Sequence, residues 1–533
     1  MVTPTATLAL GGVGQPRHLV YTRRVREKLE ALMVVLAVGS AVAIGAKRVG
    51  VPYNVALVLV GLALVFFDAL PKTPLNPEVV LVAFLPVLVF EASLVADAGA
   101  MRGASRPILA LAVPGVGLSL VATAGVATFA LSLPFATSLL LGALLAITDT
   151  VSVLLAFRSV KVPHRLAAIM EGESLFNDGT ALVLVSVATT VVATGAFDAP
   201  HFGRALGIAM VGGAALGGGF GVLGGLVLRR APDQLTTILA SLVLVFATAL
   251  ISERFHASPV IAVVVAGLIV GREARVSLEP SRMLALQGFW ETIGFSLNVL
   301  LFLLVGMQIE AGSLVREAGA IALALLALHA GRAVAVYGTF GVMRLFTKEK
   351  IPTRWQHVMV LGNIKGALSM AAVLALPATL PNRERLVTIV FGVTFVTLMT
   401  QALPFKRLLI GLGVTLQAGN VDFGRAKARL IQGRRGQTDL DELLASGLLS
   451  RHEHAQRRAA FQRRVIAAEE ILRRPGGDSA RDHVVDTALL VGQKAALLDA
   501  ARRGLVTADI ADAEVNEIDR ELLQLASDAE EHA

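Results

Sequence analysis

Several polar side chains of this sequence lie inside long apolar stretches, where they can bind an ion. Asp149 is centred in LLLGALLAITDTVSVLLAF, and Asp178 follows Asn177 in IMEGESLFNDGTALVLVSV. On a helix, Ser174 would share a face with Asp178, one turn later. Carboxylate, hydroxyl and amide oxygens are hard ligands, which suit a hard cation better than a thiophilic metal. The pattern therefore predicts a binding site for a small cation.

Protons would compete with the cation for this site. Burial disfavours the charged form of a carboxylate, whereas a bound cation favours it. Asp178 can therefore hold a cation or a proton, but not both. If the site crosses the membrane only when loaded, exchange of the cation for protons follows. The competing interpretation is buried polar contacts that only hold helices together, but ionisable groups inside a membrane are usually functional.

Other charged residues also fall within apolar segments, where each costs about 2.5–3.5 kcal/mol. Arg332 and Lys365 each require a carboxylate partner, and Glu173 is the nearest candidate in type and predicted depth. A purely structural ion pair explains these three residues well. Glu91, in LPVLVFEASL, would join the ion site or pair with Asn177.

The composition places these residues in a membrane. The 533-residue chain is 55% hydrophobic and 17% charged, whereas a soluble domain carries about 25% charged residues. We predict an all-α polytopic membrane protein with about 13 transmembrane helices, because about that many apolar segments approach spanning length. The predicted segments are 29–46, 51–67, 78–96, 107–132, 137–156, 165–195, 204–228, 235–252, 258–271, 284–309, 317–343, 355–378 and 386–410.

The basic residues predict the orientation of the chain. Alternate loops are rich in Lys and Arg, which favours a cytoplasmic location for them in a plasma or inner membrane. The tail after Lys406 would then be cytoplasmic and the N-terminus outside, although a basic flank between Arg17 and Lys28 opposes this. These loops also account for the formal charge of +8, so we expect no nucleic-acid partner. The chain has no cysteine and no metal-ligand spacing of histidines, so we expect no cofactor, and no metal beyond a transported cation.

Composition also predicts three regions: an N-terminal extension (1–28), a transmembrane domain (29–410) and a polar helical tail (416–533). The tail has apolar residues at helical spacing in VNEIDRELLQLA (515–526) and a linker pattern in RRPGGDS (473–479). It would regulate, oligomerise or bind lipid. Small residues crowd the segment 211–225, which indicates close packing of helices.

The intramembrane residues stand in motifs that resemble the cation/proton antiporter family of the NhaP and eukaryotic sodium/proton exchanger type. The resemblance spans about 29–410 and rests on six ordered blocks. These are LPVLVFEASL (85–94), ITDTVSV (147–153), VPHRLAAIMEGESLFNDGTALVL (162–184), FWETIGFSLNVLLFLLVGMQI (289–309), GNIKGALSM (362–370) and QALPFKRLL (401–409). The resemblance implies an inverted-repeat fold with two discontinuous helices that cross, broken near Asp149 and Lys365, and a homodimer.

The resemblance also implies roles for single residues. Asp178 is similar to the family's ion- and proton-binding Asp, and Asn177 before it marks the branch that is generally electroneutral, with one proton exchanged per Na⁺. Asp149, the Thr148 carbonyl and Ser174 would complete the ion shell. Glu173 would stabilise the core by pairing with basic residues, of which Arg332 is one.

Two positions depart from the family pattern. Thr150 stands where a proline is usual, and Lys365 stands where an arginine is usual. Lysine keeps the charge but loses the bidentate fork of arginine, which puts a pairing of Lys365 with Glu173 in doubt.

The sequence leaves alternatives open. Exchange of K⁺ for protons is the first, because these oxygen ligands suit Na⁺, Li⁺ and K⁺ alike. An intramembrane aspartyl protease also needs two aspartates, but the G-x-G-D block is missing and the buried Asn, Arg and Lys would have no purpose. A channel is disfavoured because a single titratable ion site indicates exchange.

Overall fold

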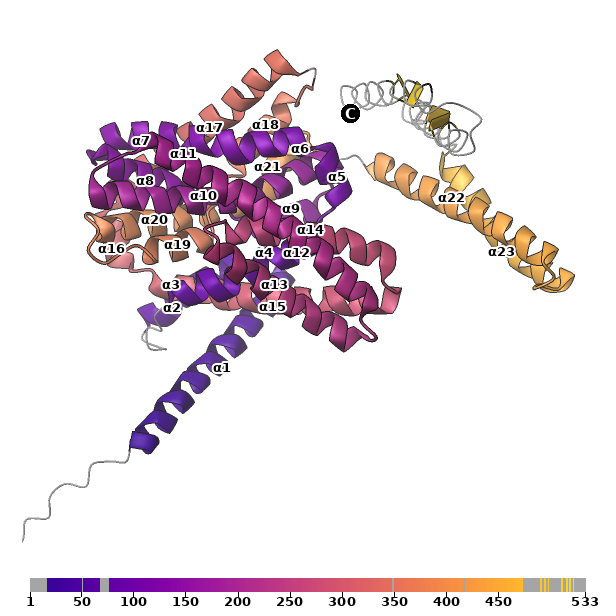
Figure 1. Cartoon of the computed structure of the whole chain (residues 1–533), viewed down its shortest axis with the longest axis horizontal. Helices are drawn as coiled ribbons and strands as arrows, with labels where there is room; N and C mark the ends of the chain where they lie inside the picture. The colour runs from indigo at the N-terminus through magenta and orange to yellow at the C-terminus, as the bar shows by residue number, and fades with distance from the viewer. Residues whose placement is uncertain are drawn as a thin grey trace, which may run out of the picture. The chain divides into compact units, whose positions relative to one another are not determined.

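The computed structural model describes residues 17–49, 51–67, 76–347, 349–415 and 418–472, with a few positions between 489 and 521. Every regular element in these residues is a helix, as the sequence predicts (Figure 1). The chain divides into two compact units, residues 1–414 and 415–533. Of the predicted N-terminal extension, residues 1–16 lie outside the described residues.

The helices of the first unit follow the predicted apolar segments. Its long helices are α1 (Arg17–Val49), α2 (Tyr53–Phe66), α4 (Leu85–Val95), α7 (Val116–Leu131), α8 (Phe135–Ala146), α9 (Thr150–Ser159), α10 (His164–Thr194), α12 (Gly213–Arg230), α13 (Gln234–Arg254), α14 (Pro259–Ser277), α15 (Pro280–Gln308), α17 (Ala318–Phe346), α18 (Thr353–Leu361), α19 (Ala367–Leu374) and α20 (Arg383–Thr397). Shorter helices are α3 (Pro77–Val79), α5 (Ala98–Gly103), α6 (Ser105–Ala110), α11 (Ala199–Gly207), α16 (Ala311–Arg316) and α21 (Phe405–Gly411). Turns of π-helix at Val80–Phe84, Leu111–Gly115, Ile208–Gly212 and Leu398–Ala402 join some of them into longer rods.

Eight helical stretches among the described residues are long and apolar enough to cross a membrane. Two shorter apolar helices, α2 and α8, accompany them. This confirms a polytopic membrane protein, while the number of about 13 crossings stays a prediction. Helix α1 begins at Arg17, so residues 17–28, which precede the first predicted span, belong to the same helix as that span.

Helix α10 carries three of the six predicted ion-binding residues, Ser174, Asn177 and Asp178, and local sequence signals mark both of its ends. It begins after Pro163 and ends at Gly195, whose φ of 71° lies in the left-handed region that favours glycine. Its 31 residues rise about 46 Å at 1.5 Å per residue, which exceeds the ~30 Å hydrocarbon core. A helix of this length tilts or projects from the membrane.

The helices of the first unit pack in two sets. The scaffold group comprises α1, α2, α4, α12, α13, α14 and α15, and the ion-site group comprises α7, α8, α9, α10, α17, α18, α19, α20 and α21. Within the scaffold group, α12 and α14 approach closely: a Cβ added at Gly217 would lie 2.3 Å from the Ala262 carbonyl oxygen. The small residues of 211–225 therefore allow close helix packing, as predicted.

Two helices of the ion-site group are broken. The first stops at Ala146 and resumes at Thr150, and the second stops at Leu361 and resumes at Ala367. Both breaks lie at the residues that the family resemblance implies. Breaks inside a membrane free backbone groups that need partners within the protein, so these positions require neighbouring polar groups.

The second unit contains a pair of packed helices, α22 (Ala418–Ala445) and α23 (Arg451–Leu472). Gly447, with φ of 76°, lies in the turn between them. The two helices pack closely where Gly436 meets Phe461. An ion pair of Arg434 with Glu469 also joins them. The predicted linker 473–479 and most of 515–526 lie outside the described residues.

Candidate ion-binding site

The two helix breaks meet each other. The Asp149 N–H donates to the Ile364 carbonyl at 2.8 Å, and the Ser369 hydroxyl donates to the Ile147 carbonyl at 3.3 Å. Gly366 permits this contact, because a Cβ at that position would lie 2.8 Å from the Cβ of Asp149. The crossing thus satisfies backbone groups that the breaks release and confirms the predicted pair of discontinuous helices.

Asp178 faces the first break from α10. The Thr148 N–H donates to Asp178 Oδ1 at 3.4 Å. The hydroxyls of Thr148 and Ser174 lie 3.0 Å apart, which places Ser174 on the face of α10 that also carries Asp178, as its spacing predicts. Asp178 is only partly enclosed, whereas Asp149 is 7% exposed. Asp178 as a whole residue is therefore less enclosed than Asp149.

Asn177 joins α10 to the end of the first half-helix. Its Nδ2 donates to the Ala146 carbonyl at 3.0 Å and to the Thr148 hydroxyl at 3.3 Å. Its Oδ1 is buried and has no hydrogen-bond partner among the described residues. A buried acceptor without a donor is uncommon in proteins, and a small cation beside Asp178 would satisfy it.

Glu173 and Arg332 form a buried ion pair across the ion-site group. Arg332 Nη1 donates to Glu173 Oε1 at 2.8 Å and Nη2 to Oε2 at 3.0 Å. The Arg332 Nε donates to the Met359 carbonyl at 3.1 Å, near the end of α18. The guanidinium charge thus faces the carboxyl end of a half-helix, where a helix dipole favours cations.

Lys365 lies in the second break and is fully buried. Its Nζ donates to Asn363 Oδ1 at 2.7 Å, and its N–H donates to the Thr397 hydroxyl at 3.2 Å. The charges of Glu173 and Asp178 act on it at longer range. The hydrogen bond of Lys365 therefore goes to an amide, while Arg332 takes both oxygens of Glu173.

Sequence reasoning missed two neighbours of Asp149. Asn54 of α2 donates from Nδ2 to Asp149 Oδ2 at 3.3 Å and also contacts the Ser152 hydroxyl. Ser152 in turn donates to the same carboxylate oxygen. Asn54 is uncharged, so the cost of intramembrane charge does not single it out, although a lone Asn in an apolar run is itself a signal.

Glu91 lies at the contact between α4 and α15. A Cβ added at Gly294 would lie 3.0 Å from Glu91 Cγ and 3.3 Å from its Oε2. The carboxylate therefore packs where α15 has no side chain. A role of Glu91 in the ion site stays a prediction.

Comparison with known proteins agrees with this geometry. Residues 33–411 match the family model described as "Sodium/hydrogen exchanger, transmembrane". The Na⁺/H⁺ antiporter NhaS2 of Synechocystis sp. is 35% identical, over 96% of this chain and 97% of its own length. The Na⁺/H⁺ antiporter ApNhaP of Aphanothece halophytica is 36% identical, over 73% of this chain and 76% of its own.

The chain belongs to the sodium/hydrogen exchanger family. Its fold is similar to that of the sodium proton antiporter MjNhaP1 from Methanocaldococcus jannaschii, with a TM-score of 0.62 at 18% identity over 73% of this chain and 99% of that one. The family is one of transporters, so the exchanger is not a protease. The charged and polar residues inside its spans thus belong to a transport protein.

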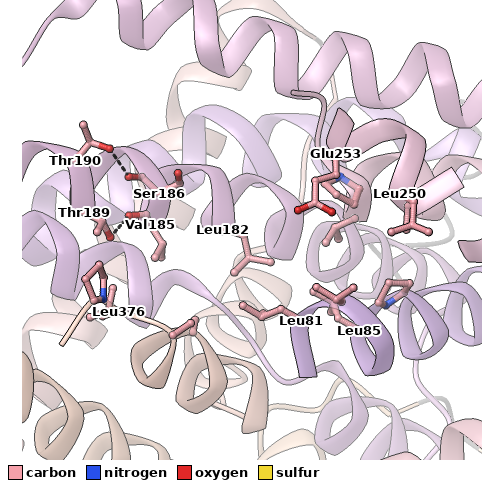
Figure 2. Close-up of a pocket in the computed structure, with 18 residues that line it drawn as sticks. Leu81, Leu85, Leu182, Val185, Ser186, Thr189, Thr190, Leu250, Glu253 and Leu376 are labelled. Atoms are coloured by element: carbon pink, nitrogen blue, oxygen red, sulfur yellow. Dashed lines mark hydrogen bonds between the residues drawn. The ribbon is translucent and has the colours of Figure 1, made fainter. Parts of the chain in front are cut away.

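Two hollows border α10 of this exchanger, one at Phe176 and one from Leu182 onward, and Asp178 lines neither of them. One, of about 460 Å³, lies between α10 and α19 on one side and α4, α13 and α14 on the other. Figure 2 shows Leu182 and the hydroxyl residues of α10 on one wall and Glu253 on the other. The second, of about 550 Å³, includes Phe176 of α10, with Arg102 and Arg272 at its edge. The first hollow lies between the scaffold group and the ion-site group, and the second lies between α14, the short helices α5 and α6, and Phe176 of α10.

Proposed function

We propose that this exchanger moves one Na⁺ against one proton through Asp178. The observation that carries the proposal is the meeting of Asp178, the Thr148 amide and Ser174 at the break of α8 and α9, next to the unpaired Asn177 Oδ1. Na⁺ would be held by the oxygens of Asp178, Ser174 and Asn177, together with Asp149 and the Thr148 carbonyl. All are hard ligands, as this cation prefers.

Exchange would follow from competition at Asp178. Na⁺ favours the ionised carboxylate, and an enclosed carboxylate without a cation favours a proton. Each form is neutralised when loaded, so the same group carries Na⁺ in one direction and the proton in the other. The two hollows along α10 would supply access from each face of the membrane in turn.

The remaining expectations concern the oligomeric state of the exchanger, its membrane and its orientation in that membrane. The exchanger would work as a homodimer in the plasma or inner membrane. The hollow bordered by Arg102 and Arg272 would face the cytoplasm, because basic residues concentrate on that side. The tail after Thr415 would be cytoplasmic, with a regulatory role.

The test is transport in proteoliposomes that carry an imposed pH gradient and a pH-sensitive dye. Addition of Na⁺ is expected to collapse the gradient with the wild type and with Glu384→Gln, a variant of an exposed acid on α20. Asp178→Asn is expected to abolish the response, because an amide neither binds a proton nor carries charge.

The other outcomes are equally informative. A response to K⁺ but not to Na⁺ would replace the proposed cation. Na⁺-dependent proton movement by Asp178→Asn at the wild-type rate would remove Asp178 from the mechanism. Absence of any response from the wild type in sealed vesicles would refute cation/proton exchange, once a chain ending at Val414 gave the same result.

A further inference from the structure

The second hollow, of about 550 Å³, is apolar at one end and basic at the other. Its walls come from α14, from the short helices α5 and α6, and from Phe176 of α10. Its volume lies within the range of about 300–1,000 Å³ that is usual for pockets that bind small molecules. Among the described residues that line it, none is a predicted ion ligand. The side chains of the walls therefore define a site of their own.

Helix α14 contributes a stripe of side chains that changes from apolar to basic. Val265, Leu268, Arg272 and Val276 are spaced by three and four residues and line the hollow together, because such spacing places residues on one helix face. The seven residues from Val265 to Arg272 rise about 10 Å along the helix. An apolar wall of that length thus extends from the arginine toward the middle of α14.

The opposite wall changes in the same direction. Arg102 belongs to α5, whereas Ile108 and Leu109 belong to α6, which leads into a membrane span. Arg275, near the end of α14, donates to the backbone carbonyls of residues 94–96 at 2.7–2.9 Å, directly before α5. This contact holds the end of α14 beside the start of α5. Both walls therefore have their arginine at the same end of the hollow.

The basic end carries positive charge that no acid neutralises. In the part of the chain that the structure describes, the guanidinium groups of Arg102 and Arg272 form no ion pair or hydrogen bond. Glu273, the acid in the wall, already accepts a hydrogen bond from Arg229 Nε at 2.6 Å and another from the Ser277 hydroxyl. Arginine binds phosphate oxygens through parallel N–H bonds. The basic end therefore suits a phosphate group.

We propose that this hollow binds an anionic phospholipid, with its phosphate at Arg102 and Arg272 and one acyl chain along the apolar stripe of α14. A free phosphate ion would leave the apolar walls uncovered, whereas an acyl chain removes them from water. An uncharged apolar ligand would leave both arginines without a counter-charge. Basic pockets between membrane helices on the cytoplasmic side bind anionic lipid head groups, and both arginines lie in segments predicted to face that side.

A lipid in this hollow would also affect transport, a consequence that rests on the proposed function. There the hollow is one of the two routes to the ion site, and Phe176 in its wall directly precedes Asn177. An acyl chain that fills the hollow excludes water and ions from it. Anionic lipid therefore slows exchange.

The first test measures lipid binding, which requires no transport. The full chain in detergent is titrated with phosphatidylglycerol or phosphatidylcholine, and native mass spectrometry counts the bound lipids. Wild type is compared with the double variant Arg102→Gln, Arg272→Gln. The matched control is the double variant Arg106→Gln, Arg230→Gln, which replaces two exposed arginines outside the hollow. Val276→Glu adds an acid at the basic end, where the side chain is 80% exposed.

Wild type and the matched control are expected to retain one phosphatidylglycerol per chain in preference to phosphatidylcholine. The Arg102→Gln, Arg272→Gln variant should bind phosphatidylglycerol roughly 30-fold more weakly, from the attraction of two basic residues for anionic lipid. Val276→Glu should also weaken it, and decides the matter if the double variant does not fold. Glycerol phosphate, which has the head group but no chain, should not displace the lipid. Equal affinity in wild type and both of these variants, displacement by glycerol phosphate, or no preference over phosphatidylcholine would each overturn the proposal.

The second test measures initial rates of Na⁺-dependent proton movement in proteoliposomes of phosphatidylcholine with increasing phosphatidylglycerol. The rate should fall for wild type and the matched control but not for the Arg102→Gln, Arg272→Gln variant, although all three meet the same membrane surface charge. A constant wild-type rate, with lipid binding intact, would overturn only the effect on transport. Absence of exchange at every lipid composition would refute the proposed function, while the lipid site is decided by the binding measurement.

Discussion

The buried ion pair of Glu173 with Arg332 gives the sharpest prediction about stability. The side chains are 4% and 7% exposed, and two parallel hydrogen bonds of 2.8 and 3.0 Å join them. Removing either partner leaves the other charge buried and uncompensated. We therefore expect Glu173→Gln and Arg332→Met each to be strongly destabilising.

The magnitude follows in two ways. Breaking a buried pair by removal of one partner costs about 3–5 kcal/mol. Two hydrogen bonds to charged groups, at about 1.5–3 kcal/mol each, give a similar total. The double variant removes both charges together, so its cost should be close to that of one single variant. The coupling energy between the two residues should then reach roughly 3 kcal/mol, the upper end for residues in contact.

The assay is the free energy of unfolding in lipid bicelles for wild type, both single variants and the double variant. Arg385→Met serves as the control, because its contact with Glu317 is longer, at 3.5 Å, and both side chains are more than a third exposed. That pair should contribute no more than about 1 kcal/mol. Additive losses in the double variant, or single losses as small as the control, would refute the reasoning.

Three further predictions concern packing, ion approach and the tail. Gly217→Ala should destabilise by about 1–3 kcal/mol, because the new Cβ meets the Ala262 backbone, whereas Gly218→Ala meets nothing within 4 Å; thermal unfolding compares the two, and equal melting temperatures would contradict this. Glu253 lines the first hollow, so Glu253→Gln should raise the apparent KM for Na⁺ entering there by less than about fivefold at low salt and not at high salt, in measurements of initial rates. An effect that did not depend on salt would exclude electrostatic attraction of Na⁺ by Glu253 as its cause. Removal of residues 415–533, which form their own unit, should leave the melting temperature of the membrane unit unchanged, and a fall of several degrees by calorimetry would show that the units depend on each other.

The intramembrane charges could be predicted from sequence because charge inside an apolar segment is rare and costly. Asp149, Asp178, Glu173, Arg332 and Lys365 all stand out for this reason. The spacing of Ser174 and Asp178 also gave their common face, since helical periodicity is regular. The structure places these residues in one region of the ion-site group.

The helix breaks could not be predicted from hydropathy. The segments 137–156 and 355–378 are mostly apolar, and each has the length of a single span. A break depends on backbone conformation at a few residues, such as the extended Ile147 and Gly366, which apolar character does not reveal. Only the resemblance to a known family located these breaks.

Contacts between residues far apart in the chain could not be predicted from the sequence either. Asn54 lies 95 positions before Asp149, and nothing local to either residue indicates the contact. The partner of Lys365 illustrates the same limit. Its charge predicts a pairing with Glu173, whereas its ammonium group donates to Asn363, two positions away.

The charges of the site explain why exchange would be tightly coupled. Na⁺ and a proton each add one positive charge at Asp178, so both loaded forms carry the same net charge through the membrane. The empty form carries one more negative charge in the same apolar surroundings. An uncompensated charge there costs about 2.5–3.5 kcal/mol, which would slow the return of the empty site by roughly 100-fold or more. On this reasoning, coupling requires no separate gate that senses occupancy.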